Sequence, residues 1–310
     1  MAWAMVFPGQ GSQSLGMLDD ALPHPVVAAT LAQASEILAT DVPALMREGP
    51  IEQLNRTEWT QPILLAASVA LYRLWRAEGG AESDYIAAHS LGEYSALVCA
   101  GALDYVEALA LVRERGRLMQ SAVPAGVGLM AAILGLEDAK VVEVCRAASG
   151  PSGVVEAVNF NAPGQVVIAG HRAAVELAMH ACKEAGAKRA LELAVSVPAH
   201  SSLMQPAAER LAIPLAACHL QRPRITVLHN VDAAPADDVA DLQHRLLRQL
   251  HQPVQWVATG EALRAREVTQ VLECGPGKVL VGLMKRIAGL QALPMDSAAA
   301  RAEAHAALSA

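Results

Sequence analysis

Short apolar runs alternate with longer stretches of helical periodicity along most of the chain, and this alternation restricts the fold more than any other feature. Residues 5–7 and 85–88 are apolar runs of strand length, whereas residues 61–77 and 91–100 have the length and spacing of buried helices. Strands that alternate with helices pair in parallel, because each helix carries the chain back across the sheet. The sequence therefore predicts an α/β core with a largely parallel sheet.

The pattern changes in the middle of the chain, where two strands follow one another without a helix between them. The predicted strands are 129–134, 154–159, 165–169 and 189–193, and the predicted helices are 137–148 and 173–185. The order βαββαβ is typical of a ferredoxin-like unit. We therefore expect a core formed by residues 1–125 and 198–310, with residues 126–197 inserted as a ferredoxin-like small subdomain.

Composition and charge argue against several classes of protein. The 310 residues are 53% hydrophobic and 18% charged, which is enough apolar material for a substantial core. The net charge of -7 is opposite to the basic footprint of a nucleic-acid-binding protein. The five cysteines are scattered without a C-x-x-C pair, as in a reducing compartment. With no basic leader and no apolar run of about 18 residues, we expect a cytoplasmic protein.

The stretch "YIAAHSLGEYSAL", residues 85–97, places Ser90 between a predicted strand and a predicted helix. Such a tight turn lifts a serine clear of the sheet, and the helix N-terminus directs backbone amides at whatever reacts there. The positions two before and two after the serine must be small, and here they are Ala88 and Gly92. The usual pattern has glycine at both, so Ala88 is a departure. Spacing alone leaves two interpretations open: a nucleophile, or a serine that caps the helix.

The loop "FPGQGSQ", residues 7–13, follows the first predicted strand. A glycine-bracketed loop at this point can bring backbone amides and Gln10 beside the Ser90 turn. Gly9 and Gly11 also begin a G-x-G-x-x-G pattern, but its sixth position is a serine and the acidic residue of a dinucleotide site is not evident. The alternative to a functional loop is an ordinary structural turn.

A serine nucleophile needs a general base, and the chain has ten histidines. His200, in "SVPAHSSLM", is the best candidate, because Pro198 opens a loop there at the predicted return from the subdomain to the core. His229 ends a predicted strand and is a weaker candidate. His89 adjoins Ser90 but should point to the opposite side of the turn. A single loop histidine is more often structural, so this argument leaves both interpretations of His200 open.

The predicted helix 104–119 carries three arginines, of which Arg115 lies on the apolar stripe, four positions from Leu111 and from Met119. A guanidinium on an apolar face needs an anion, because an unpaired buried charge is expensive. That anion is either an internal carboxylate or the carboxylate of a substrate, held by two parallel hydrogen bonds. The third option is an arginine that extends to water.

Several segments of the chain together resemble one family. In chain order they are "FPGQGSQSLGM", "HSLGEYSAL", "RGRLMQ", "VNFNAPGQVVIAG", "SVPAHSSLM", "RQLHQPVQW" and "GPGKVLVGLMKRI". The same segments stand in the same order in the malonyl-CoA:acyl-carrier-protein transacylases of bacterial fatty-acid synthesis. The resemblance runs from about residue 4 to about residue 290, and it is far more specific than the Ser90 turn alone. It implies a hydrolase-like α/β core with an inserted ferredoxin-like subdomain, in agreement with the pattern above.

The resemblance also implies catalytic roles. Ser90 matches the family's acylated nucleophile, and His200 matches its base. Gln249, in "RQLHQP", matches the residue whose main-chain carbonyl orients that histidine. Gln10 and the backbone N–H of Leu91 match the oxyanion hole.

The specificity of the family also has a match in this chain. Arg115 matches the arginine that holds the free carboxylate of malonate. Malonyl carries a carboxylate that acetyl lacks, and a guanidinium in a dry pocket discriminates on that basis. The family normally has glycine at the position of Ala88. This difference affects the fine geometry of the serine turn and the reaction rate rather than the family assignment.

The activity implied is a ping-pong transfer of the malonyl group from malonyl-CoA to the phosphopantetheine thiol of acyl carrier protein, through a malonyl-serine ester. The coenzyme A thioester and the carrier's phosphopantetheine are substrates, so no bound cofactor and no metal are expected. Neither nucleic acid nor a membrane is an expected partner, and we expect a monomer.

Four alternatives to this activity stay open from the sequence. Two come from close relatives: the malonyl transferase subunit of malonate decarboxylase and a discrete polyketide acyltransferase. "SVPAH" and "RQLHQPVQW" resemble the fatty-acid enzyme more than the polyketide versions. The other two are a serine hydrolase that releases malonate and a non-catalytic carrier-binding module. A pure binder has no need of Ser90, His200, Gln10 and Arg115 together, which argues against the last.

Overall fold

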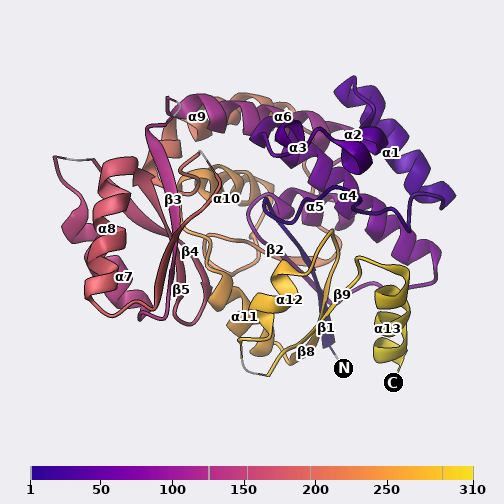
Figure 1. The fold of residues 1–310 in the computed structure, drawn as a ribbon. Helices are drawn as coiled ribbons and strands as arrows, with labels where there is room; N and C mark the ends of the chain where they lie inside the picture. Colours follow the sequence, from indigo (N-terminus) through magenta and orange to yellow (C-terminus); the bar gives the residue numbers. More distant parts are fainter. Residues whose placement is uncertain (1, 125, 152, 196, 288, 310) are drawn as a thin grey trace.

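A five-stranded sheet in the order β7-β2-β1-β8-β9 forms the centre of the larger part of the molecule (Figure 1). The computed structural model describes residues 2–124, 126–151, 153–195, 197–287 and 289–309. The strands of this sheet are β1 (Ala2–Phe7), β2 (Tyr85–Ala88), β7 (Thr226–Leu228), β8 (Val268–Glu273) and β9 (Gln291–Pro294). All four pairings are parallel, as the alternation of strands and helices predicts. The carboxyl ends of β1, β2 and β7 therefore meet at one edge of the sheet.

Helices cover both faces of this sheet, and the side chains of β1 show why. Trp3, Met5 and Phe7 pack into one hydrophobic core, whereas Ala4 and Val6 pack into another on the opposite face. The helices that contribute to the first core are α1 (Pro25–Leu38), α2 (Val42–Glu48), α3 (Ile51–Leu54), α4 (Thr57–Ala77), α5 (Gly92–Cys99), α6 (Tyr105–Ala122), α9 (Gln205–Ala217), α10 (Val239–His251) and α13 (Ala298–Ser309). Those of the second core are α11 (Trp256–Arg264) and α12 (Val279–Met284). A strand that is apolar throughout is thus buried on both sides.

A second, antiparallel sheet lies beside this core, at the left of Figure 1. Its order is β4-β5-β3-β6, from β3 (Gly128–Leu134), β4 (Val155–Ala162), β5 (Gln165–His171) and β6 (Arg189–Glu192). The helices α7 (Asp138–Ala148) and α8 (Arg172–Glu184) pack on one face of this sheet. Because β5 lies between β3 and β4, the β3-α7-β4 crossover is split, as in the ferredoxin-like arrangement that the order βαββαβ predicts.

We propose that the chain divides at the boundaries predicted from the sequence, with residues 126–197 as the subdomain and residues 1–125 and 198–310 as the core. The antiparallel sheet and its two helices all lie within the first range. The subdomain is joined to the core by backbone hydrogen bonds as well. The N–H of Phe160 donates to the carbonyl of Val254, and the N–H of Val254 donates to the carbonyl of Val158.

Some elements differ from the sequence prediction. The helical periodicity of residues 25–48 belongs to two helices, because Ala39 adopts a φ of 50° and Asp41 caps a new helix. The alanine-rich C-terminal segment, whose composition allows either a loosely held helix or a tail, forms the helix α13 (Ala298–Ser309), which packs beside β9 (Figure 1). His305 of this helix stacks on Trp75, with ring centroids 3.9 Å apart. Within the described residues, no helix combines the length and the hydropathy needed to cross a membrane.

Candidate active site

Ser90 occupies the turn between β2 and α5 in a backbone conformation that L-residues rarely adopt, with φ of 51°. The turn is crowded, because a Cβ on Gly92 would lie 2.2 Å from the carbonyl oxygen of Phe7. Only glycine fits two positions after the serine. Two positions before it, the methyl group of Ala88 is fully buried at the end of β2. The departure at Ala88 is therefore accommodated within the packed turn.

His200 faces this serine from the loop between β6 and α9. Its Nε2 lies 2.8 Å from Ser90 Oγ, and its Nδ1 lies 2.6 Å from the main-chain oxygen of Gln249. A carbonyl oxygen only accepts hydrogen bonds, so Nδ1 carries the proton and the Nε2 lone pair faces the hydroxyl. His200 is itself held at a φ of 64°, and its N–H donates to the carbonyl of Leu250. The structure thus brings together all three residues of the predicted catalytic set.

The charge state of His200 follows from its surroundings. Burial and the nearby positive charge of Arg115 lower the pKa of His200 to about 3, against the opposite effect of its hydrogen bond to Gln249. The imidazole is therefore neutral at neutral pH. A neutral imidazole beside a serine hydroxyl can accept the proton that the serine loses when it attacks.

The glycine-bracketed loop lies directly against the serine turn, as expected. A Cβ on Gly9 would be 2.5 Å from the carbonyl oxygen of His89, so the loop and the turn are in backbone contact. Gln10 donates to Thr57 Oγ1 at 3.3 Å and lines the same cavity as Ser90. Leu91 precedes the first residue of α5, so its backbone amide lies at the N-terminus of that helix.

Arg115 of α6 is buried in the same cavity, with 1% of its surface exposed. Its Nη1 donates to Gln61 Oε1 at 2.8 Å, and its Nη2 donates to Gln249 Oε1 at 2.9 Å. Its Nε has no hydrogen-bond partner, and no carboxylate of the described residues forms an ion pair with it. Burial lowers the pKa of Arg115, and the neighbouring Tyr94 and Glu93 oppose that shift. Of the three options left by the sequence, the internal ion pair and the exposed arginine are both wrong.

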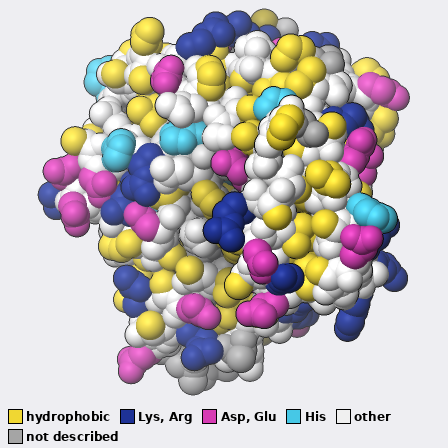
Figure 2. Space-filling view, turned by 90° about the vertical axis from the view of Figure 1, so that its left-hand side faces the viewer, with side chains coloured by type: hydrophobic (Ala, Val, Ile, Leu, Met, Phe, Trp, Pro, Cys, Tyr) yellow, Lys and Arg dark blue, Asp and Glu magenta, His cyan; other side chains and the backbone are white. Residues whose placement is uncertain are grey.

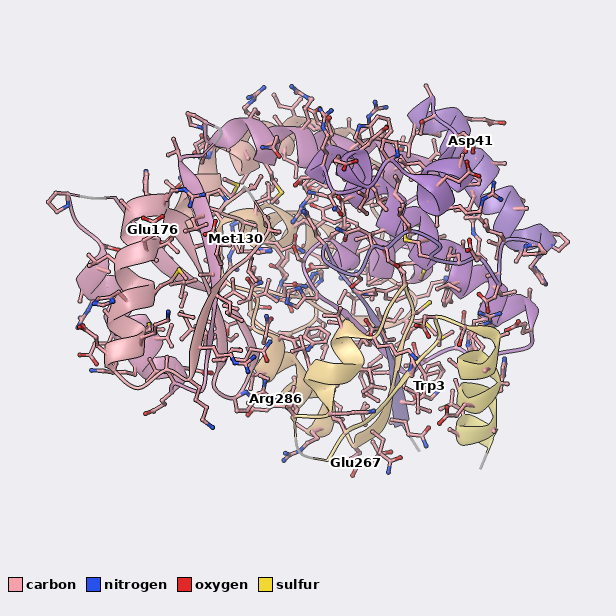
Figure 3. All side chains as sticks on the ribbon, in the orientation of Figure 1. Trp3, Asp41, Met130, Glu176, Glu267 and Arg286 are labelled. Carbon is pink, nitrogen blue, oxygen red and sulfur yellow. The ribbon has the colours of Figure 1, made fainter. Side chains whose placement is uncertain are left out.

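A cavity of about 180 Å³ connects these groups. It is lined by Gly9, Gln10, Ser12, His89, Ser90, Leu91, Arg115, Met119, Met130, Asn159, Asn161, Val167, Leu193, Val195, Ala199, His200, Val279, Leu280 and Leu283. The lining comes from both the core and the antiparallel sheet, and Met130 on β3 marks the latter in Figure 3. The lining combines ten apolar side chains with eight polar ones, a combination typical of a small-molecule site.

Two histidines named in the sequence analysis have other partners. His229, the weaker candidate for the base, has its Nδ1 2.5 Å from Glu93 Oε1 and lies outside the cavity lining. The Nε2 of His89 lies 2.8 Å from Asn161 Oδ1, and burial lowers the pKa of this imidazole. His89 also lines the cavity, but its ring is bonded to Asn161 and not to Ser90.

Sequence reasoning missed three polar residues that surround the predicted set: Gln61, Glu93 and Asn230. Asn230 Oδ1 accepts the backbone N–H of Ser90 at 2.6 Å, and Glu93 accepts hydrogen bonds from Asn230 and Gln249. The sequence did offer one signal for this group: Glu93 lies in the first turn of α5, a helix that is otherwise largely apolar. Among the described residues, no group of three or more His, Cys, Asp or Glu side chains has the arrangement of a metal site.

Comparison with known proteins gives a consistent result. The family model for the acyl transferase domain matches residues 4–300. The malonyl CoA-acyl carrier protein transacylase of Escherichia coli K12 is 54% identical over 286 residues, which cover 92% of each chain.

Solved structures agree with this result. An acyl carrier protein S-malonyltransferase from Vibrio cholerae is 51% identical, with a TM-score of 0.95 over 98% of this chain and 100% of that one. A malonyl-transacylase solved in complex with its type II polyketide acyl-carrier protein is 50% identical, with a TM-score of 0.96 over 98% and 99% of the two chains.

Proposed function

Because the chain belongs to the acyl transferase family, and within it to the malonyl CoA-acyl carrier protein transacylases, we propose that it transfers a malonyl group from malonyl-CoA to acyl carrier protein. The observation that carries the proposal is a buried guanidinium without a carboxylate partner, in one cavity with a hydrogen-bonded serine and histidine. The relatives bear the transacylase name, which favours this activity over malonate decarboxylase and polyketide relatives.

In the first half-reaction, Ser90 Oγ attacks the thioester carbonyl of malonyl-CoA while its proton passes to His200 Nε2. The imidazolium that forms is stabilised by the Gln249 carbonyl, which accepts a hydrogen bond from Nδ1–H. The carbon–sulfur bond then breaks, the thiolate of coenzyme A takes the proton from His200, and a malonyl-serine ester remains.

The second half-reaction runs the same steps toward the carrier. The phosphopantetheine thiol gives its proton to His200 and attacks the ester carbonyl. The serine oxygen leaves, takes the proton back from His200, and restores the free enzyme. The malonyl group now forms a thioester with the carrier.

The negative charge that develops on the carbonyl oxygen needs donors. We assign this role to the backbone N–H of Leu91 and to the side-chain amide of Gln10. Within the described residues, the Leu91 N–H donates to no other group, and the Gln10 amide makes only the 3.3 Å contact with Thr57. Both are therefore available to an oxyanion at the N-terminus of α5.

Arg115 supplies the specificity for malonyl in this proposal. Its Nε–H is buried without an acceptor, and its two Nη atoms are each held by a glutamine oxygen. A malonyl carboxylate in the cavity would provide the missing anion. We further propose that the protein acts in the cytoplasm as a monomer, with coenzyme A thioester and carrier as its substrates and without a bound cofactor.

The test is the intact mass of the protein after it is mixed with malonyl-CoA. We expect a malonyl adduct on the wild-type protein and none on Ser90→Ala, which should fold normally because the hydroxyl contributes one hydrogen bond. A full adduct on Ser90→Ala would place the nucleophile elsewhere. The alternatives give other outcomes: a carrier-binding module forms no adduct, and a hydrolase loses it rapidly in the absence of carrier.

A further inference from the structure

Behind the serine turn lies a fully buried carboxylate that the mechanism above does not use. Glu93, in the first turn of α5, is 1% exposed. Its Oε1 lies 2.5 Å from His229 Nδ1, and its Oε2 accepts from Asn230 Nδ2 at 2.5 Å and from Gln249 Nε2 at 2.8 Å. Burial alone would raise the pKa of Glu93, but His229 and these hydrogen bonds hold it below the ordinary value. A buried carboxylate held so completely is ionised and acts only as an acceptor.

The first neighbour of Glu93 spans the serine turn. Asn230 accepts the Ser90 N–H through Oδ1 at 2.6 Å, and its Nδ2 donates to the Ala88 carbonyl at 2.9 Å. Because Glu93 and the Ala88 carbonyl both require donors, the NH₂ group of Asn230 must face them and its oxygen must face Ser90. A serine at a φ of 51° costs about 1–3 kcal/mol and persists only where the surroundings hold it. This amide holds the two peptide groups that precede the serine.

The second neighbour reaches the base and the arginine. Gln249 Nε2 donates to Glu93 Oε2 and, at 3.0 Å, to the Ser90 carbonyl, whereas Gln249 Oε1 accepts from Arg115. Arginine only donates, and the carboxylate and the carbonyl only accept, so this amide also has a single possible orientation. The main-chain oxygen of the same residue holds His200.

We propose that Glu93 is a positioning residue: its carboxylate orients the amides of Asn230 and Gln249, and through them sets Ser90, His200 and Arg115 relative to one another. Only the malonyl part of the test below rests on the proposed function. A merely structural Glu93 would hold α5 to β7 through the contact with His229, and its loss would change stability without changing the reactivity of the folded protein.

The deciding variant is Glu93→Gln, which keeps the volume but replaces one acceptor oxygen by a donor. The probe is a fluorophosphonate, which reacts with activated serines without using coenzyme A or Arg115. Ser90 Oγ forms the bond to phosphorus, the phosphorus–fluorine bond breaks, and the serine proton passes through His200 to solvent. We expect the rate per folded molecule to fall by about ten- to a hundredfold, the range found for outer partners of site residues elsewhere. An unchanged rate would overturn the proposal.

The same variant is then tested with malonyl-CoA. The acylation rate constant at saturation should fall by a similar factor, whereas the half-saturating concentration should change by less than about threefold, because Gln61 still holds Arg115 in the cavity. If the wild-type protein takes no malonyl group but Glu93→Gln still loses reactivity with the fluorophosphonate, the proposed function fails and the positioning role stands. If the wild-type protein is acylated and Glu93→Gln equals it in both assays, only the positioning role fails.

One control variant and one further test variant complete the experiment. Glu114→Gln removes a partly exposed carboxylate paired with Arg117 on α6, and should react like the wild type. Asn230→Ser removes the amide that spans the turn while leaving Glu93, and should also slow phosphonylation; a wild-type rate would contradict the proposal. Folded fractions are measured by near-ultraviolet circular dichroism in a stabilising osmolyte. Failure of both Glu93→Gln and Asn230→Ser to fold there would show a purely structural role and overturn the proposal.

Discussion

At the scale of single residues, the site depends on two backbone conformations that side chains usually avoid. Ser90 and His200 both have positive φ, at 51° and 64°, although neither is glycine. Such residues persist only where surrounding contacts compensate for their cost, and they concentrate at functional sites. Here the compensation is visible as the Asn230 bond to Ser90 and the Leu250 bond to His200. The two conformations together leave Oγ and Nε2 2.8 Å apart.

The depressed pKa of His200 predicts a dependence of stability on pH. His200 titrates at about 3 in the folded protein, because of burial and the charge of Arg115, and at about 6.5 in an unfolded chain. Between these values the unfolded state binds a proton that the folded state refuses. The contribution of neutral His200 to the free energy of unfolding is therefore fully present above pH 6.5. It is lost as the pH falls from 6.5 toward 3, by about 1.4 kcal/mol per pH unit.

Urea unfolding of the wild type and of His200→Gln between about pH 7.5 and pH 5 measures this contribution. The free energy of unfolding should fall less steeply with decreasing pH in the variant. Equal slopes in His200→Gln and the wild type would contradict the low pKa.

Arg115 is expected to set the substrate class. Arg115→Ala removes both the attraction for the malonyl carboxylate and the cost of leaving a buried guanidinium unpaired beside an acetyl group. The variant should therefore lose malonyl transfer and gain acetyl transfer relative to it. The measurement is the ratio of kcat/KM for malonyl-CoA and acetyl-CoA. Arg117→Ala, an exposed position on the same helix, should keep the wild-type ratio, and an unchanged ratio in Arg115→Ala would remove that residue from the site.

At the scale of elements, the serine turn is held by the close approach of β1, β2 and α5. Gly92 is where this approach is tightest, since any Cβ there would overlap the carbonyl group of Phe7. The chain contains a contrasting position in α12, where a Cβ on Gly282 would meet nothing within 4 Å. The same substitution therefore has opposite effects on two short helices, α5 and α12.

We expect Gly92→Ala to destabilise the protein by about 1–3 kcal/mol, the usual cost of overpacking, because the contact is with rigid backbone. Gly282→Ala should stabilise it by about 0.5–1 kcal/mol, since alanine favours the helix and the space is open. Thermal unfolding measures both changes. A wild-type Tm in Gly92→Ala would show that the turn has room for a methyl group beside the Phe7 carbonyl.

At the scale of the whole molecule, the cavity lies where the antiparallel sheet meets the parallel core. The side chain of Arg286, which follows α12 and is labelled in Figure 3, donates to Gln165 and to the carbonyl of Pro163 at the β4–β5 turn. Lys188 packs over Gly135, whose N–H donates to Gly164 at the same turn. Basic side chains from both parts thus gather at one end of the antiparallel sheet. On the face shown in Figure 2, basic and acidic side chains are otherwise intermixed.

We expect this basic cluster to attract an acidic carrier in spite of the net charge of -7. Its candidate members are Lys188, Arg189, Lys278, Lys285 and Arg286. Exposed charges more than a Debye length apart are screened, so salt between about 50 and 500 mM should slow malonyl transfer to the carrier more than acylation by malonyl-CoA. Lys188→Gln should weaken the salt effect, whereas Lys140→Gln on α7 should not. Equal salt dependence of both half-reactions would count against a carrier-specific surface.

The sequence by itself determined the features that depend on near neighbours in the chain. The alternation of strands and helices predicted the parallel core, and the order βαββαβ predicted the antiparallel sheet. The small residues around Ser90 predicted its turn, because that requirement acts within five positions. Helix boundaries such as Asp104, which caps α6, were also predictable from a local hydrogen bond.

Only the tertiary structure decided which distant polar groups meet. Periodicity placed Arg115 on a buried face, but its partners Gln61 and Gln249 lie 54 and 134 positions away in the chain. Glu93 is likewise 136 positions from its partner His229. His229 is therefore engaged by Glu93, whereas His200 is the histidine that faces Ser90. A spacing pattern records which side of an element a residue occupies, whereas a buried hydrogen bond depends on which elements the fold packs together. That is why the buried Glu93, Asn230 and Gln249 network emerged only from the folded chain.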